Sequence, residues 1–118
     1  MARRLRDDAP GRWHHATNRG LSKRTMFEDE RDFRMFLALL AKEVRAQRLE
    51  VHAFCLMLNH YHLLVRSPSG QLSTAMANVQ REYSRWFNRT RGRDGTLVKG
   101  RFKSKVVRDM TYRCNVVT

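Results

Sequence analysis

Two histidines separated by one residue, His60 and His62, are the side chains of this sequence whose type and spacing best suit metal chemistry. On a β-strand, residues i and i+2 point to the same face, so both imidazoles can reach one cation. Neutral imidazole is a common nitrogen ligand of divalent transition metals. By the same alternation, Tyr61 points away from the pair. A His-x-His pair is, taken alone, more often incidental than a metal site, so its setting must decide.

The setting is strongly basic. The 118 residues include 24 Lys and Arg against 11 Asp and Glu, which gives a net charge of +13. Because so much charge repels itself in a compact domain, we expect a polyanionic partner, and nucleic acid is the commonest one. An acidic membrane surface would require a basic amphipathic segment with exposed aromatic residues, and no segment has this pattern. The residues predicted to bind DNA phosphates are Arg19, Arg81, Arg85, Arg89, Lys99, Arg101, Lys103 and Lys105.

The sequence also bears on location. No apolar run approaches the about 18 residues that a membrane-spanning helix needs, and residues 1–10 lack the apolar segment of a secretory signal. Cys55 and Cys114 are far apart and form no CxxC motif, which suits a reducing compartment. We therefore expect a cytoplasmic protein with no membrane partner.

Residue patterns predict an α+β fold. Residues 1–11 are expected to form a flexible basic arm, and residues 12–118 a single domain. The region 49–66 contains two apolar runs around Asn59, which predict either a tightly linked hairpin or one bent strand. The expected strands are 12–18, 49–58, 60–66 and 101–108, and the expected helices are 30–47 and 71–89, with the start of a last helix from Asp109.

This order, β-α-β-β-α-β, is that of the ferredoxin-like arrangement with a central antiparallel sheet. In that topology the first and third strands lie side by side, so residues 12–18 are expected beside residues 60–66. One of His14 and His15 must then face the same side as the histidine pair. Arg81, Arg85 and Arg89 recur every four residues and so share one face of the second helix.

The segment Leu56–Leu64 (LMLNHYHLL) resembles the signature of the HUH superfamily, in which two histidines flank a hydrophobic residue. More narrowly, the chain resembles the REP-associated tyrosine transposases and their single-tyrosine insertion-sequence relatives. Leu58 departs from the family pattern, which usually has proline at this position. Further segments that match in order and spacing are His15–Gly20, Met26–Phe33, Tyr83–Asn88 and Gly95–Ser104.

The resemblance implies a transposase-type endonuclease and strand transferase that acts on hairpin-forming single-stranded DNA. It implies that His60 and His62 hold Mg²⁺ or Mn²⁺, which polarises the scissile phosphate. A tyrosine of the last helix would attack phosphorus and form a 5′-phosphotyrosine link. His15 matches a family position, and we expect it and Asn59 to support the ligands or contact phosphate. The resemblance leaves both a monomer and a homodimer open.

The resemblance places the nucleophilic tyrosine shortly after the aromatic position that Tyr112 matches, at Thr118 or just beyond it. We therefore expect the chain to end before its catalytic tyrosine and before a third metal ligand, and to bind hairpin DNA without forming a covalent adduct. Tyr112 is the one substitute considered, although a structural role at the start of the last helix suits it better. Tyr83 is expected in the core.

Two other functions stay open on the sequence. One is a non-catalytic single-stranded nucleic-acid-binding module of the RNA-recognition type, which displays aromatic residues on its first and third strands. Here the third strand displays histidines instead, although Trp13 and Trp86 remain candidates for stacking on bases. The other is a metal-dependent nuclease that uses water as its nucleophile.

Overall fold

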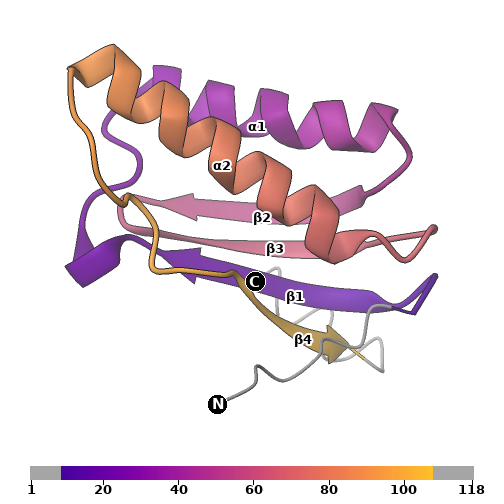
Figure 1. Ribbon diagram of the computed structural model, residues 1–118. Coiled ribbons are helices and arrows are strands. Elements are labelled where there is room, and N and C mark those ends of the chain that lie inside the picture. Colours follow the sequence, from indigo (N-terminus) through magenta and orange to yellow (C-terminus); the bar gives the residue numbers. More distant parts are fainter. Residues whose placement is uncertain (1–8, 108–118) are drawn as a thin grey trace.

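Four strands form one antiparallel sheet, and two helices cover one of its faces (Figure 1). The computed structural model describes residues 9–107. The predicted last helix, with Tyr112, and most of the predicted arm therefore lie outside the described residues. The elements are β1 (Trp13–Arg19), a short 3₁₀ turn (Leu21–Lys23), α1 (Glu30–Arg45), β2 (Glu50–Met57), β3 (His60–Arg66), α2 (Leu72–Arg91) and β4 (Lys103–Val107).

The strand order is β2-β3-β1-β4, which confirms the predicted ferredoxin-like arrangement. β1 and β3 are the two central strands, and their register pairs Thr17 with His62 and Arg19 with His60. Paired residues of neighbouring strands point to the same face. The histidine-bearing strand is therefore held on both sides, by β1 and β2. None of the helices in the described range has the length and apolarity to cross a membrane.

The strands β2 and β3 form a hairpin linked by Leu58 and Asn59, which settles the choice between a hairpin and one bent strand. This link lacks the glycine that two-residue hairpins favour. Its backbone is held from outside instead. The Leu58 carbonyl accepts hydrogen bonds from the N–H groups of Met26 and Phe27 at 2.7 and 3.0 Å, and the Asn59 carbonyl accepts one from Gly20 at 2.9 Å. The segment after β1 thus fixes the turn that precedes His60.

The core lies between the sheet and the helices. On β3, Tyr61, Leu63 and Val65 alternate towards it, as a half-covered strand requires. On α2 the predicted core face is confirmed, and Phe87, rather than Trp86, is its fully buried aromatic residue near the C-terminal end. Helix residues of this core include Phe36, Leu40, Leu72, Met76, Val79 and Tyr83.

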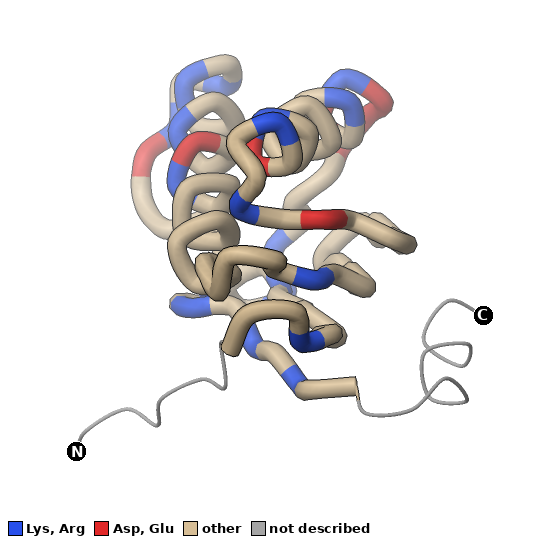
Figure 2. The backbone as a smooth tube through the Cα atoms, turned by 90° about the vertical axis from the view of Figure 1, so that its right-hand side faces the viewer, with Lys and Arg blue, Asp and Glu red and all other residues tan. Residues whose placement is uncertain are grey.

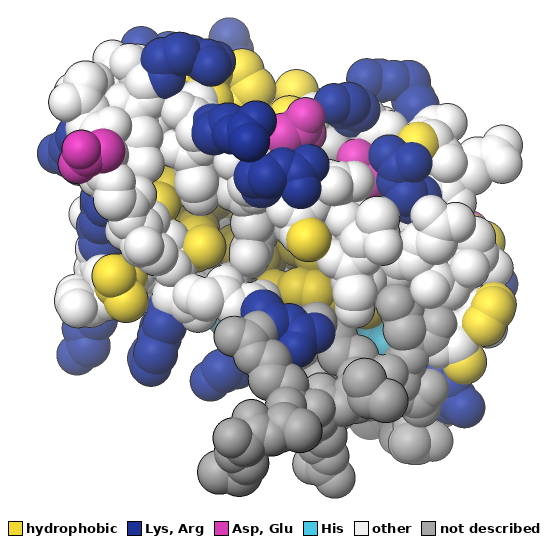
Figure 3. Space-filling view, viewed as in Figure 1, with side chains coloured by type: hydrophobic (Ala, Val, Ile, Leu, Met, Phe, Trp, Pro, Cys, Tyr) yellow, Lys and Arg dark blue, Asp and Glu magenta, His cyan; other side chains and the backbone are white. Residues whose placement is uncertain are grey.

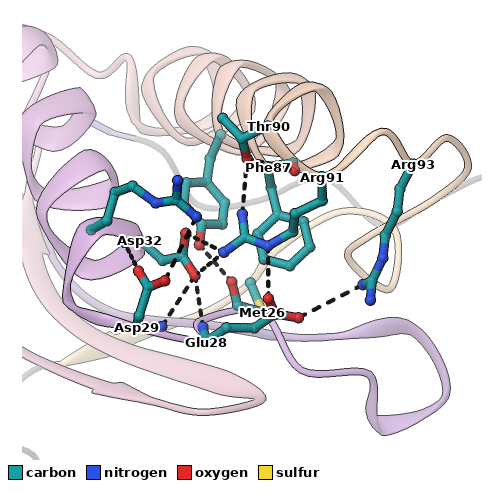
Figure 4. A network of polar contacts seen from close by, with 10 residues as sticks. Met26, Glu28, Asp29, Asp32, Phe87, Thr90, Arg91 and Arg93 are labelled. Atoms are coloured by element: carbon teal, nitrogen blue, oxygen red, sulfur yellow. Dashed lines mark hydrogen bonds and ion pairs between the residues drawn. The ribbon is translucent and has the colours of Figure 1, made fainter.

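A buried ion pair joins the start of α1 to the end of α2 (Figure 4). Asp29 caps α1 by accepting from the Asp32 N–H, and the Asp32 carboxylate, fully buried, accepts from the Asp29 N–H in return. Arg91 donates to both Asp32 oxygens at 2.8 and 2.6 Å and to Glu28 at 2.7 Å. Its guanidinium lies 3.9 Å from the centre of the Phe87 ring. The sequence analysis did not identify this network, which fixes the helix layer.

The sheet layer is poor in carboxylates. Within the described strands, Glu50 is the one acidic residue, and it pairs with Arg66 and His52. Most acidic positions lie in the helix layer, whereas basic positions occur in both layers (Figure 2). The sheet face turned away from the helices therefore offers histidines and cations to a ligand.

Candidate metal and nucleic-acid site

His60 and His62 lie on the sheet face turned away from the helices, because the intervening Tyr61 and the following Leu63 are buried in the core. Their ring centres are 5.1 Å apart and their planes nearly perpendicular, at 88°. Both side chains are half-buried. The prediction that the pair shares one face and that Tyr61 faces away is confirmed.

His15 lies directly against His62. Its Nε2 is 3.0 Å from His62 Nδ1, and the two rings stack with centres 5.2 Å apart. The prediction that His15, rather than His14, faces the pair is also confirmed, since His14 is buried on the helix side. When His62 donates its Nδ1 hydrogen to His15, its Nε2 keeps the lone pair that a metal ligand needs.

Burial lowers the pKa of His62, and the neighbouring His60 lowers it further. Burial likewise lowers the pKa of His15, with smaller contributions from His62 and Lys105. Each shift has the sign expected when a charged imidazolium loses water or meets another cation. Both shifts favour the neutral form of the ring, which is the form in which imidazole binds metals.

Asn59 orients the other ring of the pair. Its side-chain oxygen lies 2.8 Å from His60 Nδ1. Because an amide oxygen only accepts, Nδ1 is the donor in this contact, which leaves Nε2 as the nitrogen that can face a ligand. Asn59 and His15 thus contact one histidine each, at the positions that the sequence analysis expected.

A cavity of about 630 Å³ opens beside the histidines. Among the described residues, four cations line it, namely Arg19, Lys23, Lys99 and Lys103, and no carboxylate does. Such a lining favours a phosphate-bearing ligand. Lys23 was missed by the sequence analysis. Lys23 lies in a short 3₁₀ turn with positive φ at Ser22 and Lys23. Its position in the sequence, three residues after the family-matched segment His15–Gly20, is the signal that could have identified it. The lining residues that the structure describes are Thr17, Asn18, Arg19, Lys23, Asn59, His60, Tyr61, His62, Lys99 and Lys103.

The eight predicted phosphate-binding residues do not form one group. Arg19, Lys99 and Lys103 line the histidine cavity, and Lys105 lies opposite His15 in the β1–β4 register. Arg101 lies in a separate groove beside α2, together with Arg81. Arg85 and Arg89 are exposed elsewhere on α2 and line neither space.

A family model described as "Transposase IS200 like" matches residues 12–111. The chain belongs to this family. Its fold is similar to that of a structure titled as a REP-associated tyrosine transposase bound to a REP hairpin, with a TM-score of 0.74, 18% identity, and coverage of 98% of this chain and 68% of the other.

It is also similar to a protein of Deinococcus radiodurans R1 described as a transposase. The TM-score is 0.63 and the identity 16%, with coverage of 97% of this chain and 92% of the other. No curated protein matches the chain significantly. The family match confirms the resemblance to transposases, which are DNA-processing enzymes, and the two structures support the fold.

Two candidate metal ligands of this transposase, His60 and His62, lie together on one face of β3. Within residues 9–107, no three His, Cys, Asp or Glu side chains are grouped to hold an ion. The two imidazoles are suitable metal ligands. When Asn59 accepts the Nδ1 hydrogen of His60 and His15 accepts that of His62, the Nε2 atom of each ring is left to bind a metal. Imidazole suits Mn²⁺ better than Mg²⁺, which prefers oxygen ligands. Any remaining ligands would come from outside this range, from water or from DNA.

Two tyrosines of the transposase are placed by the structure, and both are buried. The Tyr61 hydroxyl donates to the Gln80 side-chain oxygen at 2.7 Å, and the Tyr83 hydroxyl donates to the Met26 carbonyl. Burial raises the pKa of Tyr83, and the nearby Asp32 raises it further. The expected core position of Tyr83 is confirmed. Neither hydroxyl is on the histidine face.

The remaining aromatic candidates make protein contacts. Trp13 is half-buried and its ring centre lies 4.3 Å from that of His52. Trp86 is also half-buried, and the guanidinium groups of Arg31 and Arg91 lie 5.7 and 5.9 Å from its ring. His52 is exposed and contacts Glu50 at 2.9 Å, as a polar-face residue of its strand should.

Proposed function

We propose that this transposase is an endonuclease and strand transferase of hairpin-forming single-stranded DNA, with a metal-assisted phosphotyrosine mechanism. The observation that carries the proposal is the cluster of His15, His60 and His62 beside a cavity to which residues 9–107 contribute four cations and no carboxylate. The similar structure whose title names a bound REP hairpin supports DNA of this type as the substrate.

The proposed roles follow from position. His60 and His62 hold Mg²⁺ or Mn²⁺, and a bound ion would supply a Lewis acid for the scissile phosphate. Asn59 and His15 keep the two rings oriented through their Nδ1 atoms. Arg19, Lys23, Lys99 and Lys103 bind the DNA phosphates around the cleavage position. The positive charge of these four side chains also attracts the DNA strand towards the histidines before any specific contact forms.

We propose that neither Tyr61 nor Tyr83 is the nucleophile. A nucleophile must reach the phosphate at the histidine face, and both hydroxyls are hydrogen-bonded on the helix side of the sheet. Incubation with hairpin DNA and Mn²⁺, followed by a denaturing gel, tests for a phosphotyrosine adduct. Any adduct should persist in Tyr61→Phe and in Tyr83→Phe. An adduct that disappears in either variant, while the variant still folds, would refute this proposal.

The metal assignment is tested by titrating Mn²⁺ into the chain and into the double variant His60→Ala/His62→Ala. We expect the variant to lose this site and to keep its metal-free DNA affinity, because the four cations remain. His52→Ala is the matched control, since His52 is an exposed strand histidine outside the cavity. Equal Mn²⁺ binding by the double variant would show that the ligand assignment is wrong.

A non-catalytic, RNA-recognition-like module is the alternative. It would bind bases through aromatic residues on the open face of the two central strands. Here that face carries His15, His60 and His62, and Trp13 stands at the far end of β1 against His52. A histidine variant that loses Mn²⁺ binding therefore separates the enzyme from the binding module.

A further inference from the structure

The sheet face that carries the histidine pair also carries two sulfur side chains, Cys55 and Met57 of β2. In the register of β2 with β3, Cys55 is paired with His62 and Met57 with His60. Because paired residues of neighbouring strands point to the same face, both sulfurs lie on the histidine side of the sheet. Both side chains are exposed. The proposed DNA chemistry makes no use of them.

The two sulfur atoms are close enough to bind one ion. The Cys55 thiol donates to the Met57 thioether, and Sγ lies 3.5 Å from Sδ. With metal–sulfur bonds of about 2.3 Å, the length of a zinc–thiolate bond, this separation corresponds to an angle of about 100° at the ion. That angle is near the tetrahedral one. The two sulfurs can therefore chelate an ion at the separation they already have.

His60 is the imidazole best placed to complete this site. Its Nδ1 is held by Asn59, in the turn that joins β2 to β3, which leaves Nε2 to a ligand. The ring of His62 is held instead by His15 of β1, on the side of β3 away from β2. Within residues 9–107 no three His, Cys, Asp or Glu side chains are grouped, and this set requires only one Cys and one His because its third ligand is a thioether.

The three ligands suit Cu(I). Thiolate and thioether sulfur are soft ligands that select this ion, and imidazole also binds copper. The electrostatics favour the same choice, because the cavity that His60 lines receives four cations from the described residues, and these oppose a dication more than a monocation. In the view of Figure 3, Lys and Arg side chains project along the lower, sheet side of the molecule. Cys55 releases its thiol proton to the buffer when the sulfur–copper bond forms, so the ion and the thiolate together carry no net charge.

We infer that Cu(I) binds Cys55 Sγ, Met57 Sδ and His60 Nε2 at the β2 side of the histidine face. Since one Nε2 lone pair cannot hold two ions, bound Cu(I) removes a ligand from the divalent ion and lowers the affinity for Mn²⁺. This competition rests on the proposed function, whereas the Cu(I) site itself does not. The transposase thereby has a means of losing its divalent ion when Cu(I) is present.

The site is tested by titrating Cu(I) without oxygen, against the coloured chelator bicinchoninate, into the chain and its variants. Cys55→Ser should weaken the binding of Cu(I) by more than about a hundredfold, and Met57→Leu by at least about tenfold, since even residues that only orient metal ligands contribute tenfold to a hundredfold. Both positions are exposed, so both variants should fold, and circular dichroism checks this. Cys114→Ser removes the other cysteine of the chain and should keep the affinity. His52→Ala removes an exposed histidine of β2 and should keep it too.

X-ray absorption at the copper edge identifies the ligands independently of affinity. The unmodified chain should show two sulfur neighbours and one nitrogen neighbour, and Met57→Leu should show one sulfur fewer. The Cu(I) site is overturned if Cys55→Ser or Met57→Leu binds Cu(I) like the unmodified chain, or if Cys114→Ser weakens the binding as much as Cys55→Ser does. A spectrum without sulfur neighbours also overturns it.

The competition is measured by titrating Mn²⁺ in the presence of one equivalent of Cu(I). Cu(I) should weaken the binding of Mn²⁺ to the unmodified chain but not to Cys55→Ser, which keeps both histidines of the pair. Equal Mn²⁺ binding with and without bound Cu(I) would overturn the competition. The proposed function fails separately, when His60→Ala/His62→Ala binds Mn²⁺ like the unmodified chain.

Discussion

The salt dependence of DNA binding measures how many phosphates the histidine cavity contacts. Each phosphate contact to a single strand contributes about −0.7 to the slope of log K against log salt. Four lining cations, Arg19, Lys23, Lys99 and Lys103, therefore contribute about −2.8 if each meets one phosphate. A fourfold rise in salt then weakens binding about fiftyfold. Replacing Lys99 and Lys103 by Gln should leave a contribution of about −1.4, or about a sevenfold weakening.

The predicted quantity is the difference between the two slopes, about 1.4, because contacts elsewhere add equally to both proteins. Fluorescence anisotropy with a labelled single strand, from about 50 to about 200 mM salt, gives the slopes. Arg34→Gln/Arg45→Gln makes the same change in net charge on α1, outside the cavity and at residues that are not predicted to bind DNA, and should leave the slope almost unchanged. If both variants reduce the slope equally, the protein attracts DNA through its overall field, and the cavity has no particular part in binding.

Two further predictions concern stability. Arg91→Met should lower the free energy of unfolding, measured in urea, by about 3–5 kcal/mol, because it leaves Asp32 buried without its partner. The control Arg89→Met, at an exposed position of the same helix, should change the free energy of unfolding by less than about 0.5 kcal/mol. Equal losses in the two variants would refute the stabilising role of the Asp32–Arg91 pair. The pKa of His62 and His15 is lowered on folding, so their contribution to stability is complete above about pH 6.5 and is lost as the pH falls through the lowered values. The midpoint of urea unfolding should therefore fall between about pH 7.5 and about pH 5, and His15→Gln/His62→Gln should make this fall smaller. An unchanged pH profile in the variant would show that other groups cause the loss of stability.

The sequence was sufficient for the order of elements and for the side of β3 on which each residue lies. Alternation alone put Tyr61 in the core and His60 and His62 outside it. The ferredoxin-like order put one of His14 and His15 beside the pair, and the family resemblance favoured His15. Side-chain alternation is a local rule and strand order is a topological one. Both rules still hold when the predicted end of a strand is wrong by one residue. The predicted strand 12–18 and the observed β1, Trp13–Arg19, differ by such a shift.

The grouping of cations could not be derived in the same way. The spacing of Arg81, Arg85 and Arg89 shows that they share a helix face, but not where that face lies relative to the histidines. α2 covers the opposite side of the sheet from His60, and Arg81 alone of the three lines the groove beside Arg101. Likewise, Asp32 and Arg91 are 59 residues apart, so no local pattern indicates their ion pair. Tertiary packing decides both features.

The composition of the cavity bears on the order in which metal and DNA bind. Two imidazoles offer a dication no negative charge, and the four cations of the lining oppose its approach. DNA phosphates would neutralise these cations and supply oxygen ligands to the same position. If His60 and His62 hold the ion as proposed, DNA must therefore raise its affinity, and by reciprocity the ion must raise the affinity for DNA by the same factor. A cavity to which the described part of the chain gives cations and no carboxylate thus suits an enzyme whose metal site is completed by its substrate.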